Sequence, residues 1–413
     1  MSLFFNLIVV HIWGAGELVK HASHLDCPTL LSTSQILKCA IKVDPEVQRA
    51  QADVHIAKAE LSVAGQRINP SLELSSSVGD KLGDKTSDFS GQFLHTFELG
   101  GKRSKRMSVA EAKLKAAETR LKQAQESVIV PVIMSLNRIR QIETEKKILE
   151  SSLDHWDEIR RGLRDRLALT PEQRTSLTVF DLASVDAEFG ISQLRAEEID
   201  YRQKLEMSLR QFLKLSPSML PSMKILWPDI RMDVNEIRSS IYLLTLVEQE
   251  IAMKELEVQE SLKWPDLSVG PTLSYQREGA LGDTKVGFKL ALPLPLFHRN
   301  RGGRELAAAS ETKATLTTEL TLESLLIKRR REVSQYRRAV EVLKKMGGFE
   351  KIEREYKRVE GLFRRGVLAA PLVIEAHRQM IDSTRSLNRQ ELMALESLWT
   401  IFQLDGRVLE EAL

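Results

Sequence analysis

The chain has 413 residues, 28% of them charged and few of them Gly or Pro, which excludes an intrinsically disordered polypeptide. The net charge of +3 is small for this length, and Lys and Arg are interleaved with Asp and Glu. This pattern disfavours a nucleic-acid-binding protein, which usually carries a basic stripe. The two cysteines, Cys27 and Cys39, define neither a disulfide framework nor a four-ligand metal site.

The segment 1–28 is a candidate export leader. It has an apolar stretch from Leu3 to Trp13, but no Lys or Arg precedes Lys20, so the positive first part of a signal is missing. The run 21–27 has the metal-like spacing His-x-x-His-x-x-Cys, although a leader is the plainer explanation. No stretch elsewhere approaches 18 uninterrupted apolar residues, so we expect no membrane-spanning helix, and any membrane contact must come from strands.

A first half, 29–215, is predicted to contain four helices and two strands. The helices are expected at 33–42, 45–67, 101–165 and 176–214, and the strands at 71–78 and 88–99 with polar turn residues at 79–87 between them. The long third helix carries apolar residues in a strict heptad pattern, which favours a coiled-coil-like contact. Pro131 should kink or split it, and a turn is expected at 166–175.

A proline-rich connector, 216–233, leads to a second half, 234–413, with the same plan. Here we expect helices at 234–263 and 305–362, a last helix that ends near 404, and strands at 267–275 and 284–292. Gly347 and Gly348 should break the long helix. The last helix has a heptad seam rich in small residues, which lets helices approach closely.

The two halves match best where strand meets long helix. The first junction reads Glu98-Leu99-Gly100-Gly101-Lys102-Arg103, and the second reads Pro293-Leu294-Pro295-Leu296-Phe297-His298-Arg299-Asn300-Arg301-Gly302-Gly303-Arg304. Asn69-Pro70 precedes the first strand pair, as Trp264-Pro265 precedes the second. Such a duplication predicts two copies of one helix–strand–strand–helix unit.

These motifs resemble the TolC family of outer-membrane efflux channels, and in particular its cation-efflux (CzcC-like) branch. The similarity extends from about Leu30 to about Gly406. It implies a mainly α fold with a small β part, in which a duplicated unit of long coiled-coil-like helices plus four strands forms a trimeric α-barrel/β-barrel channel. Four strands from one chain cannot close a sheet, and open edges are forbidden in lipid, so copies would pool their strands. The family's trimer would supply twelve.

Cations occupy both strand-to-helix junctions, where the helix dipole disfavours positive charge. Because cations stand at a helix N-terminus in both junctions, an external anion such as a headgroup phosphate is suggested as their partner. A run of charges exposed to solvent is an equal alternative. The glycines would permit the sharp change of direction. The predicted membrane-interface junction residues are Gly100, Gly101, Lys102, Arg103, Arg301, Gly302, Gly303 and Arg304.

The resemblance also implies helical-hairpin tips that dock onto an adaptor protein. The predicted docking tip is Arg365, Gly366, Val367 and Leu368, where apolar residues stand at a loop apex. At the first tip Thr175 stands where the family has Gly, so the resemblance does not define the geometry of docking there. Asp181 and Glu375 match acidic family positions and are the candidate periplasmic gate, although a surface Asp or Glu is the commoner fate.

No catalytic motif is present, so we expect no enzyme, no cofactor and no resident metal. The expected function is the passive outer-membrane duct of a tripartite efflux pump, with metal cations as cargo. Its partners would be two further copies of the chain, a periplasmic adaptor (membrane fusion) protein, an inner-membrane transporter of the RND type and outer-membrane lipid, and not nucleic acid. Drug efflux, type I secretion and a soluble coiled-coil scaffold are the alternatives.

Overall fold

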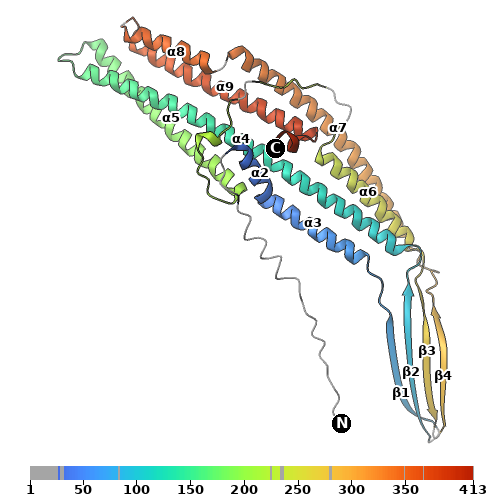
Figure 1. Cartoon of the computed structure of the whole chain (residues 1–413). Helices are drawn as coiled ribbons and strands as arrows, with labels where there is room; N and C mark the ends of the chain where they lie inside the picture. The colour runs from blue at the N-terminus through green and yellow to red at the C-terminus, as the bar shows by residue number, and fades with distance from the viewer. Residues whose placement is uncertain are drawn as a thin grey trace, which may run out of the picture. The chain divides into compact units, whose positions relative to one another are not determined.

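The computed structural model describes residues 27, 32–81, 84–223, 226–232, 237–278, 281–347, 349–365 and 367–412 (Figure 1). The candidate leader 1–28, except Cys27, and the tip residue Gly366 lie outside the described residues. The helices are α2 (Thr33–Val43), α3 (Pro45–Ala64), α4 (Lys102–Arg164), α5 (Pro171–Leu209), α6 (Ser240–Ser261), α7 (Arg301–Met346), α8 (Phe349–Arg364), α9 (Ala370–Leu404) and α10 (Val408–Ala412). The strands are β1 (Ser71–Lys81), β2 (Asp84–Phe97), β3 (Leu267–Glu278) and β4 (Leu281–Ala291).

Two compact units share these elements. Unit 1 comprises 1–48, 124–236 and 328–413, and unit 2 comprises 49–123 and 237–327. Each unit therefore draws on both sequence halves, and α4 and α7 contribute to both. The predicted duplication is visible in the element order, since helix, two strands and a long helical hairpin occur twice.

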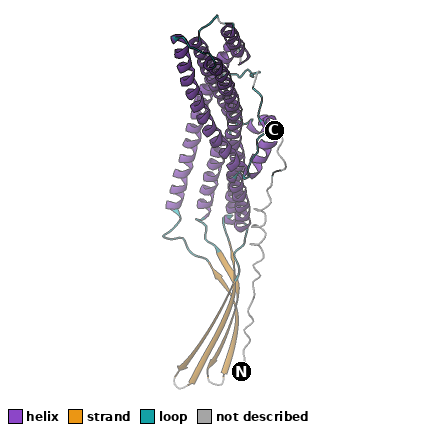
Figure 2. Cartoon of the chain, turned by 90° about the vertical axis from the view of Figure 1, so that its left-hand side faces the viewer, coloured by secondary structure: helices purple, strands orange, loops and turns teal. Residues whose placement is uncertain are grey.

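Unit 2 contains a single antiparallel sheet in the order β1-β2-β3-β4 (Figure 2, orange). The strands are longer than expected, because 79–81 and 84–87, predicted as part of a turn, extend β1 and β2 instead. A gap in the β2–β3 ladder lies opposite Pro271, which has no N–H to donate. Beside it, a Cβ on Gly270 would lie 1.7 Å from the carbonyl oxygen of Phe93, so only glycine fits there.

The helices of unit 2 pack through small residues. Ala57 of α3 and Ala117 of α4 are buried against Val54, with Leu114 and Leu121 beside them. Three of these residues belong to the heptad pattern of the third predicted helix, and the predicted contact is confirmed. The helix itself runs unbroken through Pro131, so the expected split is absent.

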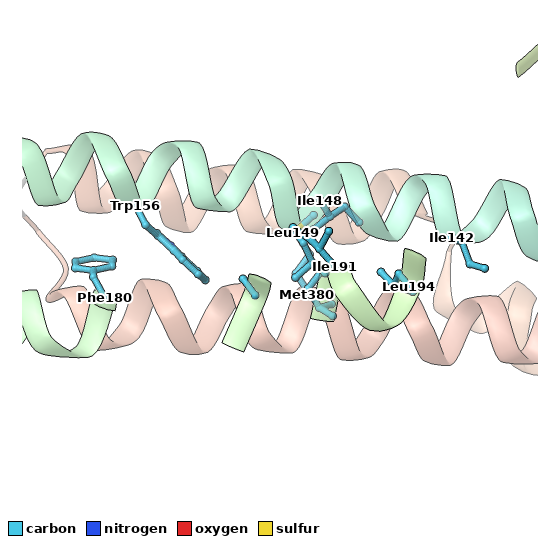
Figure 3. Packing of buried hydrophobic residues seen from close by; sticks show 10 residues of the cluster. Ile142, Ile148, Leu149, Trp156, Phe180, Ile191, Leu194 and Met380 are labelled. Atoms are coloured by element: carbon cyan, nitrogen blue, oxygen red, sulfur yellow. The ribbon is translucent and has the colours of Figure 1, made fainter. Parts of the chain in front are cut away.

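Unit 1 has its core between α4, α5 and α9, where Trp156 and Phe180 are fully or nearly buried (Figure 3). The predicted seam of α9 is buried or half-buried along its length. The predicted break before α8 is also confirmed, since Gly347 has φ 75°. No helix in the described part of the chain is long and apolar enough to cross a membrane.

Two expectations in unit 1 are wrong. The turn predicted at 166–175 is shorter, because Thr170 caps α5 through a reciprocal capping box with Gln173 and the helix begins at Pro171. Cys27 and Cys39 form a disulfide, with their Cα atoms 5.7 Å apart. Their spacing in sequence could not reveal this pairing, which bonds Cys27 to a buried position of α2.

Candidate functional surfaces

The sheet has two exposed faces of opposite character. One face carries the side chains Leu72, Leu74, Phe89, Phe93, Leu273, Tyr275, Val286, Phe288 and Leu290, all of them at least 40% exposed. The other face carries Ser, Thr, Gln, Glu and Lys, and Lys289 Nζ donates to Gln92 Oε1 at 2.8 Å there. Apolar side chains that are exposed along a whole face require a covering that one chain does not supply.

At the first junction, Gly100 and Gly101 turn the chain from β2 into α4. Both have positive φ, 74° and 70°, which favours glycine. A Cβ on Gly100 would lie 2.6 Å from Cδ1 of Trp264. Lys102, predicted as a cation at the membrane interface, is instead nearly buried. Its Nζ lies 2.6 Å from Asp266 Oδ1, and its side chain is only 10% exposed.

The neighbouring cations of this junction also have partners within unit 2. Arg103 Nε donates to the carbonyl oxygen of Gly65 at 2.7 Å, and Arg106 is ion-paired with Glu98. Lys105 Nζ donates to the carbonyl oxygen of Glu257 at 3.2 Å. These contacts compensate the positive charges that the dipole of α4 disfavours, without an external anion.

The second junction uses different residues for the same change of direction. Asn300, and not the Gly pair, has positive φ, 50°, and its Nδ2 donates to the carbonyl oxygen of Gln259 at 2.8 Å. Gly303 lies inside α7, where a Cβ would be 2.3 Å from Asn300 Oδ1. The cation Arg301 is 85% exposed and pairs with Glu305 at 2.9 Å. This junction therefore keeps two cations, Arg299 and Arg301, at the surface.

The tips between long helices expose apolar side chains. In the α8–α9 connection Val367 is 66% exposed, Arg365 is exposed and Leu368 is half-buried. In the α4–α5 connection Leu167 is fully exposed, which sequence reasoning missed because it considered Pro171 and Thr175 instead. Both tips thus expose an apolar side chain to solvent in the single chain.

The two candidate gate acids are each held by arginine on neighbouring turns or helices. Asp181 Oδ1 accepts from Arg160 Nη1 at 2.9 Å and from Arg164 Nη2 at 3.4 Å. Glu375 lies 2.9 Å from Arg378, and hydrogen bonds from Gln379 and then Arg378 lower the pKa of its carboxyl group. Glu375 is therefore negatively charged near neutral pH, and both acids are paired with arginine within their own chain.

A buried ionic network in unit 1 was missed by sequence reasoning. Glu391 of α9 pairs with Arg140 of α4 at 2.5 Å, and Asn388 donates to Glu145 at 2.7 Å. Both carboxylates are only 1% exposed. In sequence, polar residues beside a heptad seam look like those of a solvent-exposed helix face. Only their burial in the structure shows that they form a network.

A metal centre is absent from the described residues, since none of their His, Cys, Asp and Glu side chains form a group of three or more. Of the predicted His-x-x-His-x-x-Cys run, only Cys27 is described, and its sulfur is bonded to Cys39.

Comparisons with known proteins agree with this arrangement. Residues 36–167 match the family model described as "Outer membrane efflux protein". The chain is 25% identical over 287 residues to the cobalt-zinc-cadmium resistance protein CzcC of Cupriavidus metallidurans, which covers 67% of each chain.

Solved structures show the same fold at lower identity. The CmeC outer membrane channel of Campylobacter jejuni superposes with a TM-score of 0.73 at 14% identity, covering 91% of this chain and 86% of CmeC. CusC, a transmembrane channel, superposes with a TM-score of 0.71 at 13% identity, covering 90% and 91%. The chain therefore has the fold of these outer-membrane channels, and its residues 36–167 match the outer membrane efflux protein family model.

Proposed function

We propose that three copies of this chain form a passive outer-membrane duct of a tripartite efflux pump. The proposal rests on the sheet, which has one apolar face and one polar face. Its edge strands β1 and β4 can each pair with a strand of another copy. Its strands have 11, 14, 12 and 11 residues, which suits the length of about 9–11 residues that a tilted strand needs to cross a bilayer. Alternation between lipid-facing and lumen-facing side chains is typical of such strands.

Closure by several copies follows from the edges of the sheet. In the chain, β1 pairs only with β2 and β4 only with β3 among the described strands. Unpaired backbone groups cost several kcal/mol each in hydrocarbon, so β1 of one copy must pair with β4 of the next. Three copies would contribute twelve strands, the number that the family resemblance implies.

We propose divalent heavy-metal cations as the cargo, on the basis of the similarity to CzcC, which is named for cobalt, zinc and cadmium resistance. A wide passive duct does not require a resident metal site. The test is metal tolerance of cells that lack the chain, compared with their tolerance of a dye. Loss of metal tolerance alone supports this cargo, and loss of dye tolerance alone supports drug efflux.

The tips are proposed to dock onto a periplasmic adaptor, which in turn engages an RND-type inner-membrane transporter. Val367 and Leu167 are the exposed apolar contacts, and Arg365 and Leu368 flank the first of them. Replacing Val367 with Asp should abolish export and leave the amount of trimer unchanged. The matched control is Leu226→Asp, at an exposed apolar position of the connector. Equal effects of both variants would remove the docking role from the tip.

The membrane-interface role of the junctions is supported mainly at the second one. Arg301 is exposed, whereas Lys102 and Arg103 already have partners within the chain. Arg301→Glu should therefore lower membrane insertion without lowering stability, whereas Lys102→Glu should lower both.

Asp181 and Glu375 are proposed to line a constriction at the periplasmic end. Because each acid is paired with an arginine, ion pairs and not isolated carboxylates would determine the charge of the constriction. Asp181→Asn should raise the ion conductance of the channel in planar bilayers. An unchanged conductance would assign Asp181 to a surface ion pair only.

A further inference from the structure

Helix α5 is apolar on two opposite faces. One face is buried in the core of unit 1, where Figure 3 shows Phe180, Ile191 and Leu194. The opposite face carries large apolar side chains that are 57% to 67% exposed: Leu182, Val185, Phe189 and Ile199. The first three of these, which we call the α5 ridge, are spaced by three and four residues, as in helices that pack on other helices. A helix that is apolar on both sides lies between two packing surfaces, and the described part of the chain supplies one of them.

The α8–α9 hairpin has an apolar groove. Its volume is about 350 Å³, and its lining comes from α8, α9 and the end of α7. The apolar lining residues are Met346, Ile352, Tyr356, Val359, Ala376 and Met380. On α9 the small side chains of Ala376 and Ser383 leave room for the ridge of another helix. None of the described lining residues belongs to α5, so the ridge of the same chain does not fill this groove.

The α5 ridge and the groove lie at the same height along the two helical hairpins. Near the tips, the rings of Phe180 on α5 and Phe363 on α8 have their centroids 6.4 Å apart. Farther from the tips, Gly190 of α5 lies beside α9, since a Cβ on it would be 3.8 Å from Nη2 of Arg385. The ridge lies between positions 180 and 190, and the groove residues of α9 lie between the tip and position 385. The ridge can therefore meet the groove of a copy that is not shifted along the helices.

We propose that the α5 ridge of one copy packs into the α8–α9 groove of the next copy. A rotation about an axis along the helices carries the groove to the next copy without changing its height. Because ridge and groove are different surfaces, the contact is head-to-tail, and a closed ring uses every ridge and every groove. The contact covers the apolar side chains that a single chain leaves exposed. The inference rests on the proposed trimeric duct and adds an interface in unit 1 to the pairing of β1 with β4.

Cysteine crosslinking of the purified full chain, in detergent and without any other protein, tests this contact. One cysteine replaces Val185 and a second replaces Ser383. Under oxidation we expect covalent oligomers that end at the trimer. The matched control keeps Val185→Cys and places the second cysteine at Glu396, about 20 Å farther along α9, where no crosslink should form. No crosslink through position 383, or an equal one through position 396, would overturn the proposal.

The outcome can be separated from that of the duct itself. If a cysteine at Ser77 in β1 crosslinks to β4 and the pair at Val185 and Ser383 does not crosslink, copies close the sheet but this interface is wrong. If neither pair crosslinks, the proposed trimeric duct fails as well.

Two phenylalanine variants measure what the α5 ridge contributes. Phe189→Glu places an unpaired charge against the apolar groove and should lower the association constant of the trimer at least about tenfold. Phe212→Glu is the matched control, because Phe212 is 96% exposed and lies after the end of α5, outside the ridge. Analytical ultracentrifugation on dilution measures both constants, and circular dichroism checks that the helices are retained. Equal losses in the two variants would overturn the role of the ridge.

Discussion

Lys102 Nζ lies 2.6 Å from Asp266 Oδ1 and joins the start of α4 to the residue before β3, 164 positions later in the chain. The lysine side chain is 10% exposed and the aspartate 33%. The contact joins the two sequence repeats within unit 2. It also compensates a cation at a helix N-terminus, where the dipole disfavours it.

Removing one partner of this pair should destabilise unit 2. We expect Asp266→Asn to cost about 1–3 kcal/mol, because a nearly buried ammonium group loses its countercharge. The measurement is the unfolding midpoint in denaturant. The exchange Lys102→Asp with Asp266→Lys should recover part of the loss, and a double variant worse than either single one would contradict this explanation.

Replacing a junction glycine with alanine should lower stability at the first junction but not at the second. Gly100→Ala should cost about 1–3 kcal/mol, since its φ is 74° and the new Cβ would meet Trp264 at 2.6 Å. Gly302→Ala is the matched control, because nothing lies within 4 Å of the new Cβ in α7. It should be neutral or stabilise by about 0.5–1 kcal/mol. The same loss at both positions would refute the role given to Gly100.

The buried pair of Arg140 and Glu391 should contribute far more than a surface pair. Glu391→Ala leaves an uncompensated, largely buried guanidinium, which costs about 3–5 kcal/mol. Glu341→Ala breaks an exposed pair with Lys345, 64% and 74% exposed, and should leave the unfolding midpoint nearly unchanged because solvent screens the pair. Thermal unfolding of both variants under one condition measures the difference. Similar midpoints would show that the network in unit 1 is solvated.

The free energy of unfolding should decrease as the pH is lowered, because His377 is buried as a neutral imidazole in the folded chain. Its pKa is lowered to about 4 from 6.5, so the unfolded chain binds more protons between these values, and stability decreases as the pH falls from 6.5 to 4. The loss amounts to roughly 3 kcal/mol over that window. His377→Met should flatten the dependence measured by unfolding midpoints. An equally steep dependence in His377→Met would assign it to other groups.

The long-range plan could be predicted from the sequence, because long periodic helices and the repeated junction motifs are local signals. The ends of β1 and β2 could not be predicted, because the residues 79–87 are polar. In sequence, polar residues of a strand end resemble those of a turn. The partner of Lys102 was missed because Asp266 is distant in sequence. The disulfide of Cys27 and Cys39 was missed because two cysteines alone define no disulfide framework, and Asn300 was overlooked beside a more familiar Gly pair.

The central claim, that copies of the chain close the sheet through β1 and β4, is tested most directly by cysteine crosslinking in cells. One cysteine replaces Ser77 in β1, and a second replaces Lys285, Gly287 or Lys289 in turn in β4; all four positions face the polar side of the sheet. Within one chain two strands separate these edges by about 14 Å, beyond the reach of a disulfide, so any bond between them joins two copies. We predict a covalent trimer in the outer-membrane fraction for at least one pair. A soluble monomer without crosslinks for all three pairs would contradict the claim.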